Sequence, residues 1–177
     1  DLPSLGRYYP EGHPLHGEET IEIRQMTAKE EDILTSATLL KKGIALDKVV
    51  ENIIVNKSIN PKSLLVGDRN AIIIAARVSG YGSDYNVTLN CPACAEKSQR
   101  VFNLNSAEIN HADDFTDVGV THNGGGIFSV ELHRLQNVNV QFRLMNGADE
   151  NALVKKAKTG EKFVTRQLYR IIHSVNG

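Results

Sequence analysis

The sequence lacks the features that mark membrane, secreted and disulfide-rich proteins. It has no tryptophan and only two cysteines among 177 residues, too few for a disulfide framework and suited to a reducing compartment. Its apolar runs all fall short of the roughly 20 residues that a membrane-spanning helix needs. The N-terminus has neither the basic nor the apolar region of a signal peptide. We therefore expect no membrane among its partners.

The sequence also has no marked excess of basic or acidic residues. The chain has 20 basic and 21 acidic residues, which gives a formal net charge of −1. Surfaces that bind nucleic acid or anionic membranes carry clusters of positive charge, so nucleic acid is not an expected partner. We expect shape and apolar contact to hold other proteins to this chain.

Catalytic motifs are absent as well. The run Gly124–Gly126 lacks the Lys-Ser/Thr pair of a phosphate-binding loop, and we interpret it as a flexible turn. Asp113, Asp114 and Asp117 lack the alternate spacing and closing glutamate of a calcium loop, which favours a solvated acidic loop. No serine stands in a nucleophile elbow. We expect no catalytic residue, no cofactor-binding residue and no enzymatic activity.

Proline and glycine are concentrated in residues 1–20, at a spacing that excludes a helix of useful length. We predict an extended N-terminal arm. The arm contains Leu2, Leu5, Tyr8 and Tyr9, and large apolar side chains are costly to leave in water. We expect these four residues to lie against the domain or to bind a neighbouring subunit, with a free terminus as the alternative.

Residues 21–80 have the pattern of a compact helical half. A short strand is predicted over Ile21–Arg24. A helix follows, with its start marked by the capping box Thr27–Glu30 and its end by Gly43. A second helix begins near Leu46, where apolar residues recur at helical spacing.

The apolar run Ala71–Ala76 is the predicted centre of the core. Asp68 before it can cap a helix start, and Gly80 after it can end a helix. Six consecutive apolar residues predict a helix that is buried on most sides. We expect Arg69 to form an ion pair on this helix rather than to take part in catalysis.

Residues 81–145 change to the period of two that is typical of strands. One hairpin is predicted from Tyr85–Asn90 and Val101–Leu104, and a second from Phe128–Leu132 and Val138–Leu144. Because one face is apolar, we predict a small antiparallel sheet covered on one side by the helices. The connection over residues 105–126 is long for a compact domain, so it is either mobile or ordered by a partner.

Residues 146–177 are predicted to be helical, most strongly over Lys162–Val175. One stripe of this last helix is apolar and consists of Val164, Leu168, Ile171, Ile172 and Val175. The stripe either packs back on the core or binds another protein, and both alternatives stay open. The whole chain is thus predicted as an α+β fold, in which a helical half packs with a small antiparallel sheet of two hairpins and ends in an amphipathic helix.

The two cysteines form a C-x-x-C motif, Cys91 and Cys94, at the turn of the first predicted hairpin. Two thiolates from one tight turn make half of a zinc knuckle, because a closed zinc site needs four ligands. The candidates for further ligands are His13 and His16 in the arm and His111 and His122 in the long connection. We favour a metal-free remnant of a knuckle over a zinc site within the chain, and a zinc site completed across subunits is the least favoured of the three alternatives. A redox role is weaker still, because strands rather than a helix flank the motif.

Several short motifs resemble one family in their order along most of the chain. They are Leu2–Pro10, Ile23–Glu31, Gly67-Asp68-Arg69 before a helix ending at Arg77, the strand into Cys91–Cys94, and Phe142-Arg143-Leu144 near Gly147. In these motifs the chain resembles the baseplate hub assembly proteins of contractile-tailed bacteriophages of the T-even type. Members of that family often have a fuller cysteine pattern at the turn than this chain has.

The resemblance implies a non-enzymatic structural and assembly component of a phage tail baseplate, in the hub or its immediate surroundings. The implied partners are other tail and baseplate proteins, in multiple copies within a symmetric assembly. The implied location is the tail baseplate of the virion, and the host cytoplasm during assembly. The main alternative is an assembly chaperone for hub and tape-measure proteins that is absent from the mature virion. A third possibility is a binding module built on a zinc knuckle.

Overall fold

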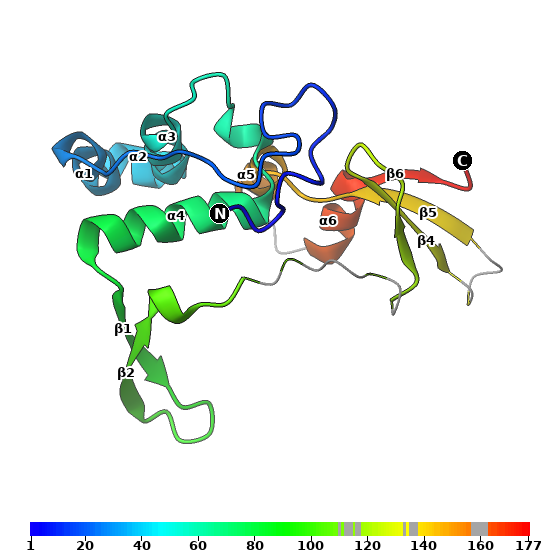
Figure 1. Cartoon of the computed structure of the whole chain (residues 1–177). Coiled ribbons are helices and arrows are strands. Elements are labelled where there is room, and N and C mark those ends of the chain that lie inside the picture. Colours follow the sequence, from blue (N-terminus) through cyan, green and yellow to red (C-terminus); the bar gives the residue numbers. More distant parts are fainter. Residues whose placement is uncertain (110, 112–114, 116–117, 133, 135–137, 157–162) are drawn as a thin grey trace.

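A computed structural model describes residues 1–109, 111, 115, 118–132, 134, 138–156 and 163–177. These residues confirm the α+β class, with six α-helices and two antiparallel sheets of two and four strands. Figure 1 shows the helical half at one end, the four-stranded sheet at the other, and a hairpin that projects from the end of the longest helix. Within these ranges, no helix has the length and apolar character needed to cross a membrane.

Two helices, α1 (Ala28–Thr35) and α2 (Ala37–Lys42), form where the sequence predicts one. At the start of α1, the Glu30 carboxylate accepts a hydrogen bond from the Thr27 backbone N–H at 2.9 Å, as the predicted capping box requires. Ser36 interrupts the helix because its backbone is extended and its side chain caps α2. Gly43 ends α2 at a φ of 68°, a left-handed conformation that glycine adopts at little cost.

Helix α3 (Ala45–Ile53) confirms the second predicted helix, and its buried face includes Val49, Val50 and Ile53. The short 3-10 helix η1 (Pro61–Ser63) follows. The predicted strand over Ile21–Arg24 is wrong. This segment forms an isolated bridge between Ile23 and Ile54, because the chain beside it has just left a helix and offers no strand to extend the ladder.

Helix α4 (Val66–Tyr81) runs alongside α1–α3 and continues one residue past the predicted stop at Gly80 (Figure 1). It buries Ile72 and Ala76, whereas Ile74 is 40% exposed. The prediction of a helix buried on most sides is therefore wrong. The neighbouring helices cover one face, and the apolar run extends round the helix beyond that face.

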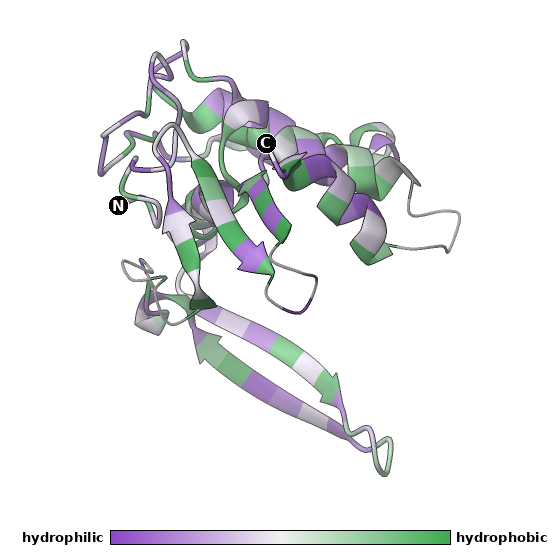
Figure 2. Cartoon of the chain, turned by 90° about the vertical axis from the view of Figure 1, so that its right-hand side faces the viewer, coloured by the Kyte–Doolittle hydropathy of each residue, from purple (hydrophilic) through white to green (hydrophobic). Residues whose placement is uncertain are grey.

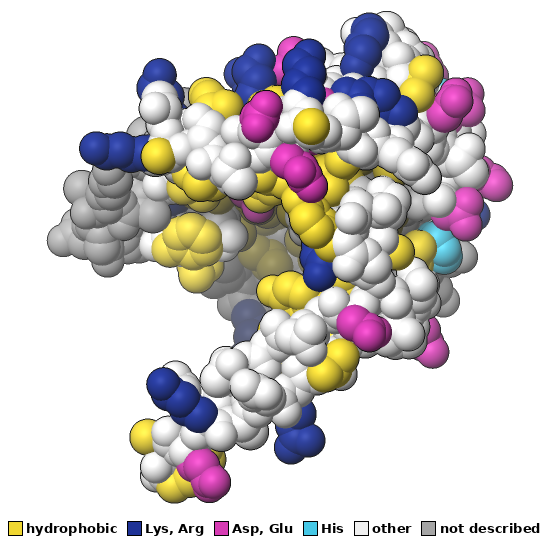
Figure 3. Space-filling view, turned by 90° about the vertical axis from the view of Figure 1, so that its left-hand side faces the viewer, with side chains coloured by type: hydrophobic (Ala, Val, Ile, Leu, Met, Phe, Trp, Pro, Cys, Tyr) yellow, Lys and Arg dark blue, Asp and Glu magenta, His cyan; other side chains and the backbone are white. Residues whose placement is uncertain are grey.

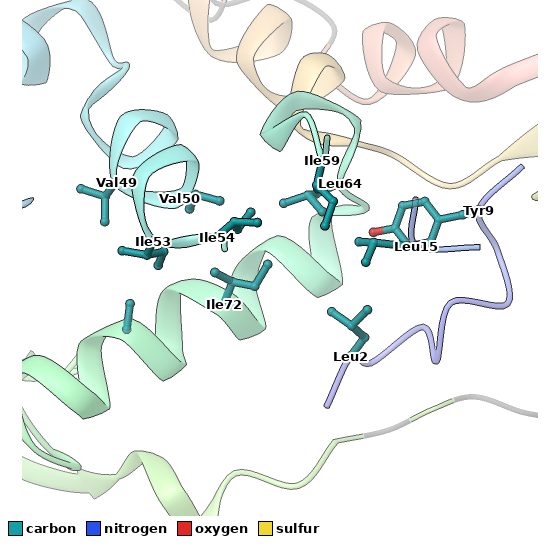
Figure 4. Close-up of a cluster of buried hydrophobic side chains, with 11 residues drawn as sticks. Leu2, Tyr9, Leu15, Val49, Val50, Ile53, Ile54, Ile59, Leu64 and Ile72 are labelled. Atoms are coloured by element: carbon teal, nitrogen blue, oxygen red, sulfur yellow. The ribbon is translucent and has the colours of Figure 1, made fainter. Parts of the chain in front are cut away.

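The N-terminal arm completes the core. Residues 1–20 fold into successive turns instead of the predicted extended segment, and they lie between the helical half and the four-stranded sheet (Figure 1). Figure 4 shows side chains from the arm meeting those of α3, α4 and the η1 segment in one cluster. Burial of each large apolar side chain stabilises the fold by about 1.5–3 kcal/mol. The buried members are Leu2, Tyr9, Leu15, Val49, Val50, Ile53, Ile54, Ile59, Leu64, Ile72 and Ala76.

The two predicted hairpins belong to separate sheets. Strands β1 (Asp84–Asn90) and β2 (Lys97–Asn103) pair only with each other. The second sheet has the order β3-β4-β5-β6, beginning with β3 (Val120–His122), β4 (Ile127–Leu132) and β5 (Val138–Arg143). The expectation that helices cover both hairpins is wrong for the first, which extends away from the body (Figure 2).

The last helix of the C-terminal segment ends earlier than predicted. Helix α5 (Gly147–Lys156) precedes α6 (Phe163–Ile171), and the chain then becomes the strand β6 (Ile172–Val175). The predicted helix over Lys162–Val175 is therefore wrong in its last turn. Strand β6 pairs antiparallel with β5, which supplies the hydrogen bonds that a continued helix would have made within itself.

Candidate functional site

A buried carboxylate fastens the N-terminal arm to the helical half. Asp68 in the first turn of α4 is fully buried. Its carboxylate accepts hydrogen bonds from Ser4 N at 2.9 Å, Ser4 Oγ at 2.6 Å and Tyr9 Oη at 2.7 Å. Burial and the negative charge of Asp68 raise the pKa of Tyr9 far above its usual value, so its hydroxyl stays protonated and donates. Asp68 thus accepts hydrogen bonds from the arm and does not act as the predicted helix cap.

The arm residues predicted to bind a partner divide into two groups. Leu2 and Tyr9 are 0% and 1% exposed, so of the two predicted alternatives these residues take the contact with their own domain. Their side chains pack in the core of their own chain because hydrogen bonds to Asp68 hold the arm against α4. Leu5 and Tyr8 are partly buried.

The Tyr8 ring lies against the four-stranded sheet, with centroids 5.3 Å from Phe128 and 5.3 Å from His122. Phe115 of the long connection adds an edge contact to Tyr8 at 6.1 Å. The described part of that connection therefore contacts the arm. The acidic residues predicted to be solvated there, Asp113, Asp114 and Asp117, lie outside the described residues.

Arg69 forms the ion pairs predicted for it. Its guanidinium is 2.8 Å from Asp47 Oδ1 on α3 and 2.9 Å from Glu150 Oε2 on α5. Asn151 Nδ2 donates a further hydrogen bond to Asp47 Oδ2 at 2.6 Å. This network is partly buried between three helices and has the geometry of a structural link.

Three of the four candidate histidine ligands make hydrogen bonds elsewhere in the described structure. His13 bonds Ser63 Oγ at 2.8 Å, His16 bonds the Tyr9 carbonyl at 2.7 Å, and His111 bonds the Pro3 carbonyl at 2.9 Å. His122 lies in the aromatic cluster on the sheet. Across the part of the chain that the structure describes, no three His, Cys, Asp or Glu side chains gather as a metal site would require.

The hairpin β1–β2 has an apolar face that is not covered by its own chain. In the pairing register, Tyr85 lies opposite Phe102 and Val87 opposite Arg100, and opposed residues of an antiparallel pair share a face. Tyr85 is 47% exposed, Phe102 is 51% exposed, and Leu89 on the same face is 47% exposed. A two-stranded hairpin by itself is marginally stable in water, so this face is suited to a partner.

The tip of the hairpin is formed by the C-x-x-C motif. Cys91 N donates to Glu96 O, and Ala95 N donates to Cys91 O, each at 2.9 Å. Ala95 has a φ of 58°, a left-handed conformation that costs a non-glycine residue about 1–2 kcal/mol. Backbone N–H groups of Cys94 and Ala93 donate to the Cys91 sulfur and lower the pKa of its thiol. Both thiols are free and exposed.

The stripe predicted near the C-terminus is also exposed. On α6, Val164 is 65% exposed and Leu168 is 46% exposed, with Tyr169 beside them at 82%. Ile171 is partly buried, and Ile172 and Val175 lie on β6 rather than on the helix. Arg143 of β5 fixes the end of α6, because its guanidinium donates to the Arg170 carbonyl at 3.0 Å and pairs with Asp149 at 2.7 Å.

An apolar hollow that sequence reasoning missed lies between α1, α3 and α4. It encloses about 240 Å³ and is lined by residues that include Met26, Leu34, Leu46 and Tyr81. Figure 3 shows hydrophobic side chains gathered in this hollow above the root of the hairpin. The exposure of Leu46 on the otherwise buried face of α3 arises here, and the helical period alone gives no signal of it.

Comparisons with known proteins give one match. A family model described as T4 bacteriophage base plate protein matches residues 7–176. Searches of curated proteins and of solved structures return no match.

Proposed function

The chain belongs to the T4 bacteriophage base plate protein family, and from this premise we propose that it is a structural and assembly component of the baseplate hub or its immediate surroundings. It acts without catalysis, by contact with other tail proteins. Family membership supports a baseplate role and phage tail partners. The position in or near the hub and the absence of catalysis are the finer parts of the proposal.

The observation that carries the proposal is the projecting hairpin. Strand β2 is exposed along its whole length, and β1 is exposed except at Val87. An element with this much apolar surface and no cover from its own chain gains stability by docking. Both of its edges also lack a neighbouring strand within the described structure, and free edges accept an added strand from a partner.

The exposed face of α6 supports a second contact. Val164, Leu168 and Tyr169 form an apolar surface on a helix that is fixed to the sheet by Arg143. Rigid surfaces bind with a smaller entropic cost than mobile ones. Two docking surfaces on different parts of the chain suit a subunit that joins several neighbours.

Substitutions on the two faces of the hairpin test this proposal. The double variant Tyr85→Ser and Phe102→Ser removes the apolar pair from one face, and we expect it to lose incorporation into baseplates while the purified chain keeps its circular dichroism spectrum. Thr88→Ser with Gln99→Ser, a pair on the opposite face, is the matched control and should incorporate normally. Normal incorporation of the first variant would overturn the docking role of this face.

Mass spectrometry of purified virions tests the stage at which the chain acts. A permanent component is present in the tail at a fixed ratio to other baseplate proteins. Its absence from infectious particles, together with failed hub assembly when it is deleted, would replace the structural role by that of an assembly chaperone.

A further inference from the structure

We propose that the tip of the hairpin is half of a zinc site, and that the corresponding tip of a second copy of this chain completes it. The site holds one Zn²⁺ between Cys91 and Cys94 of each copy. It goes beyond the proposed function, because it predicts an ion and a self-association that a baseplate role does not require.

The turn at the tip of the hairpin has the shape of a zinc knuckle. In a zinc knuckle, two cysteines separated by two residues lie on one tight turn, so that both thiolates point to a single ion. Here Cys91 and Cys94 lie on such a turn, closed by the hydrogen bonds between Cys91 and the backbone of Ala95 and Glu96.

The backbone of Ala95 closes this turn in a strained conformation. Its left-handed φ of 58° is costly for alanine, and in the strands on either side the residues are extended. This residue closes the turn directly after the second cysteine. Local strain of this kind is typical of residues that position a binding site.

Two cysteines are half of the ligands that a structural zinc site needs. A structural zinc site is tetrahedral and closed by four protein ligands, and the described chain brings no third His, Cys, Asp or Glu to the pair. The described residues therefore supply two ligands, and we infer that an outside group supplies two more. An identical turn is the simplest such group, because a twofold axis through the ion then generates four equivalent sulfurs.

The tip of the hairpin is accessible to a second copy of the chain. Each strand of the hairpin has seven residues, which carries the tip roughly 20 Å from its root. Figure 2 shows the tip clear of the rest of the chain. Two copies can thus meet tip to tip without contact between their bodies.

Binding releases protons and needs no oxidant. Four thiols lose four protons and coordinate one Zn²⁺, which leaves a net charge of −2 on the centre. Near this centre each copy carries one acidic and one basic residue, Glu96 and Lys97, whose charges offset each other. The affinity should rise with pH, because metal ions compete with protons for thiolates.

Titration of the full reduced chain with Co²⁺ and Zn²⁺ tests the inference. We expect Co²⁺ to give the visible bands of a tetrahedral tetrathiolate site at one ion per two chains. Analytical ultracentrifugation should show a monomer that becomes a dimer with Zn²⁺ and reverts with a chelator. Cys91→Ser and Cys94→Ser should each abolish both results.

Ala95→Gly is the matched control, because it changes the turn without touching a thiol and should keep both results. The inference is overturned by the absence of binding, by one ion per monomeric chain, or by zinc-dependent dimers of the serine variants. Loss of the dimer would leave the baseplate role intact, and loss of baseplate incorporation in the Tyr85→Ser and Phe102→Ser variant would leave the zinc dimer intact, so the two proposals fail separately.

Discussion

Tyr9 and Asp68 are 59 positions apart in the sequence, and the Tyr9 hydroxyl donates a hydrogen bond to the Asp68 carboxylate at 2.7 Å. The same hydroxyl accepts a hydrogen bond from the Leu65 backbone N–H at 3.1 Å. One phenol therefore satisfies a buried carboxylate and the first turn of α4 together. This relationship makes the N-terminal arm part of the fold.

Tyr9→Phe should destabilise the chain by about 1–3 kcal/mol, because it leaves a buried acceptor and a buried N–H without this partner. Urea unfolding followed by circular dichroism measures the change. Tyr169→Phe removes a hydroxyl from a ring that is 82% exposed and should change the stability by less than about 0.5 kcal/mol. Equal effects of the two variants would show that the buried hydrogen bonds contribute nothing.

Leu2→Ala should lower the free energy of unfolding by about 2–5 kcal/mol, the range for truncation of a buried leucine. The reason is that the Leu2 side chain is 0% exposed. Leu5→Ala, on the same arm but only partly buried, should cost less than half as much. The midpoint of urea unfolding compares the two. A small effect of Leu2→Ala would mean that the arm does not pack in the core.

Glu30→Gln should lower the free energy of unfolding by about 2 kcal/mol at pH 7, which is within the range for a hydrogen bond to a charged group. Arg24 donates to the fully buried Glu30 carboxylate at 2.7 and 3.0 Å, and these hydrogen bonds, with those from Thr27, hold the pKa of Glu30 well below its usual value despite burial.

The pH dependence of this loss follows from the same shift. The pKa of Glu30 is lower in the folded than in the unfolded chain, where glutamate has a pKa of about 4.3. The stabilisation is therefore complete above the unfolded pKa and is lost as the pH falls through the folded value. Urea unfolding of the parent and Glu30→Gln at pH 7 and pH 3 should show a smaller difference at pH 3. Glu31→Gln, with an exposed side chain, should show little difference at either pH.

Gly126→Ala should be more destabilising than Gly125→Ala. Both glycines have left-handed backbones, with φ of 77° and 58°, so each alanine costs about 1 kcal/mol in backbone strain. A Cβ on Gly126 would also collide with the Tyr8 carbonyl oxygen, whereas a Cβ on Gly125 meets open space. We expect a total of at least about 2 kcal/mol for Gly126→Ala. Equal thermal unfolding midpoints for the two variants would contradict this contact.

Replacement of residues 85–102 by a two-residue glycine turn should change the stability of the remaining chain by less than about 1 kcal/mol. Every residue removed except Val87 is exposed or lies at the exposed tip. Asp84 and Asn103 lie opposite each other, so a short turn can join them. Urea unfolding measures the outcome, and a loss of cooperative folding would show that the hairpin supports the core.

The elements that sequence patterns predicted well depend on local interactions. Helix α3 follows from an apolar face at helical spacing, and the start of α1 follows from the Thr27–Glu30 pair. The hairpin of β4 and β5 follows from alternation, with Phe128 opposite Phe142 as the two apolar faces require. In each of these elements, neighbouring residues carry enough information to specify the structure.

The elements that sequence patterns missed depend on partners far along the chain. The arm was predicted to be extended because its prolines and glycines exclude a helix, and no local signal points Ser4 toward Asp68. Ile172 and Val175 continue the apolar stripe of α6, yet pairing with β5 draws them into a strand. The candidate site follows the same rule: the exposed C-x-x-C turn was predicted, whereas the hollow beside Leu46 depends on how three helices pack.

The arrangement of Tyr8 and Tyr9 has a consequence for synthesis on the ribosome. These adjacent residues pack in opposite directions, Tyr9 into the helical core and Tyr8 onto Phe128 of the four-stranded sheet. The arm leaves the ribosome before either of its docking surfaces exists, and Phe128 emerges some 120 residues later. The Tyr8 ring must therefore stay in water until Phe128 has been translated, whereas Tyr9 can pack as soon as α4 is complete.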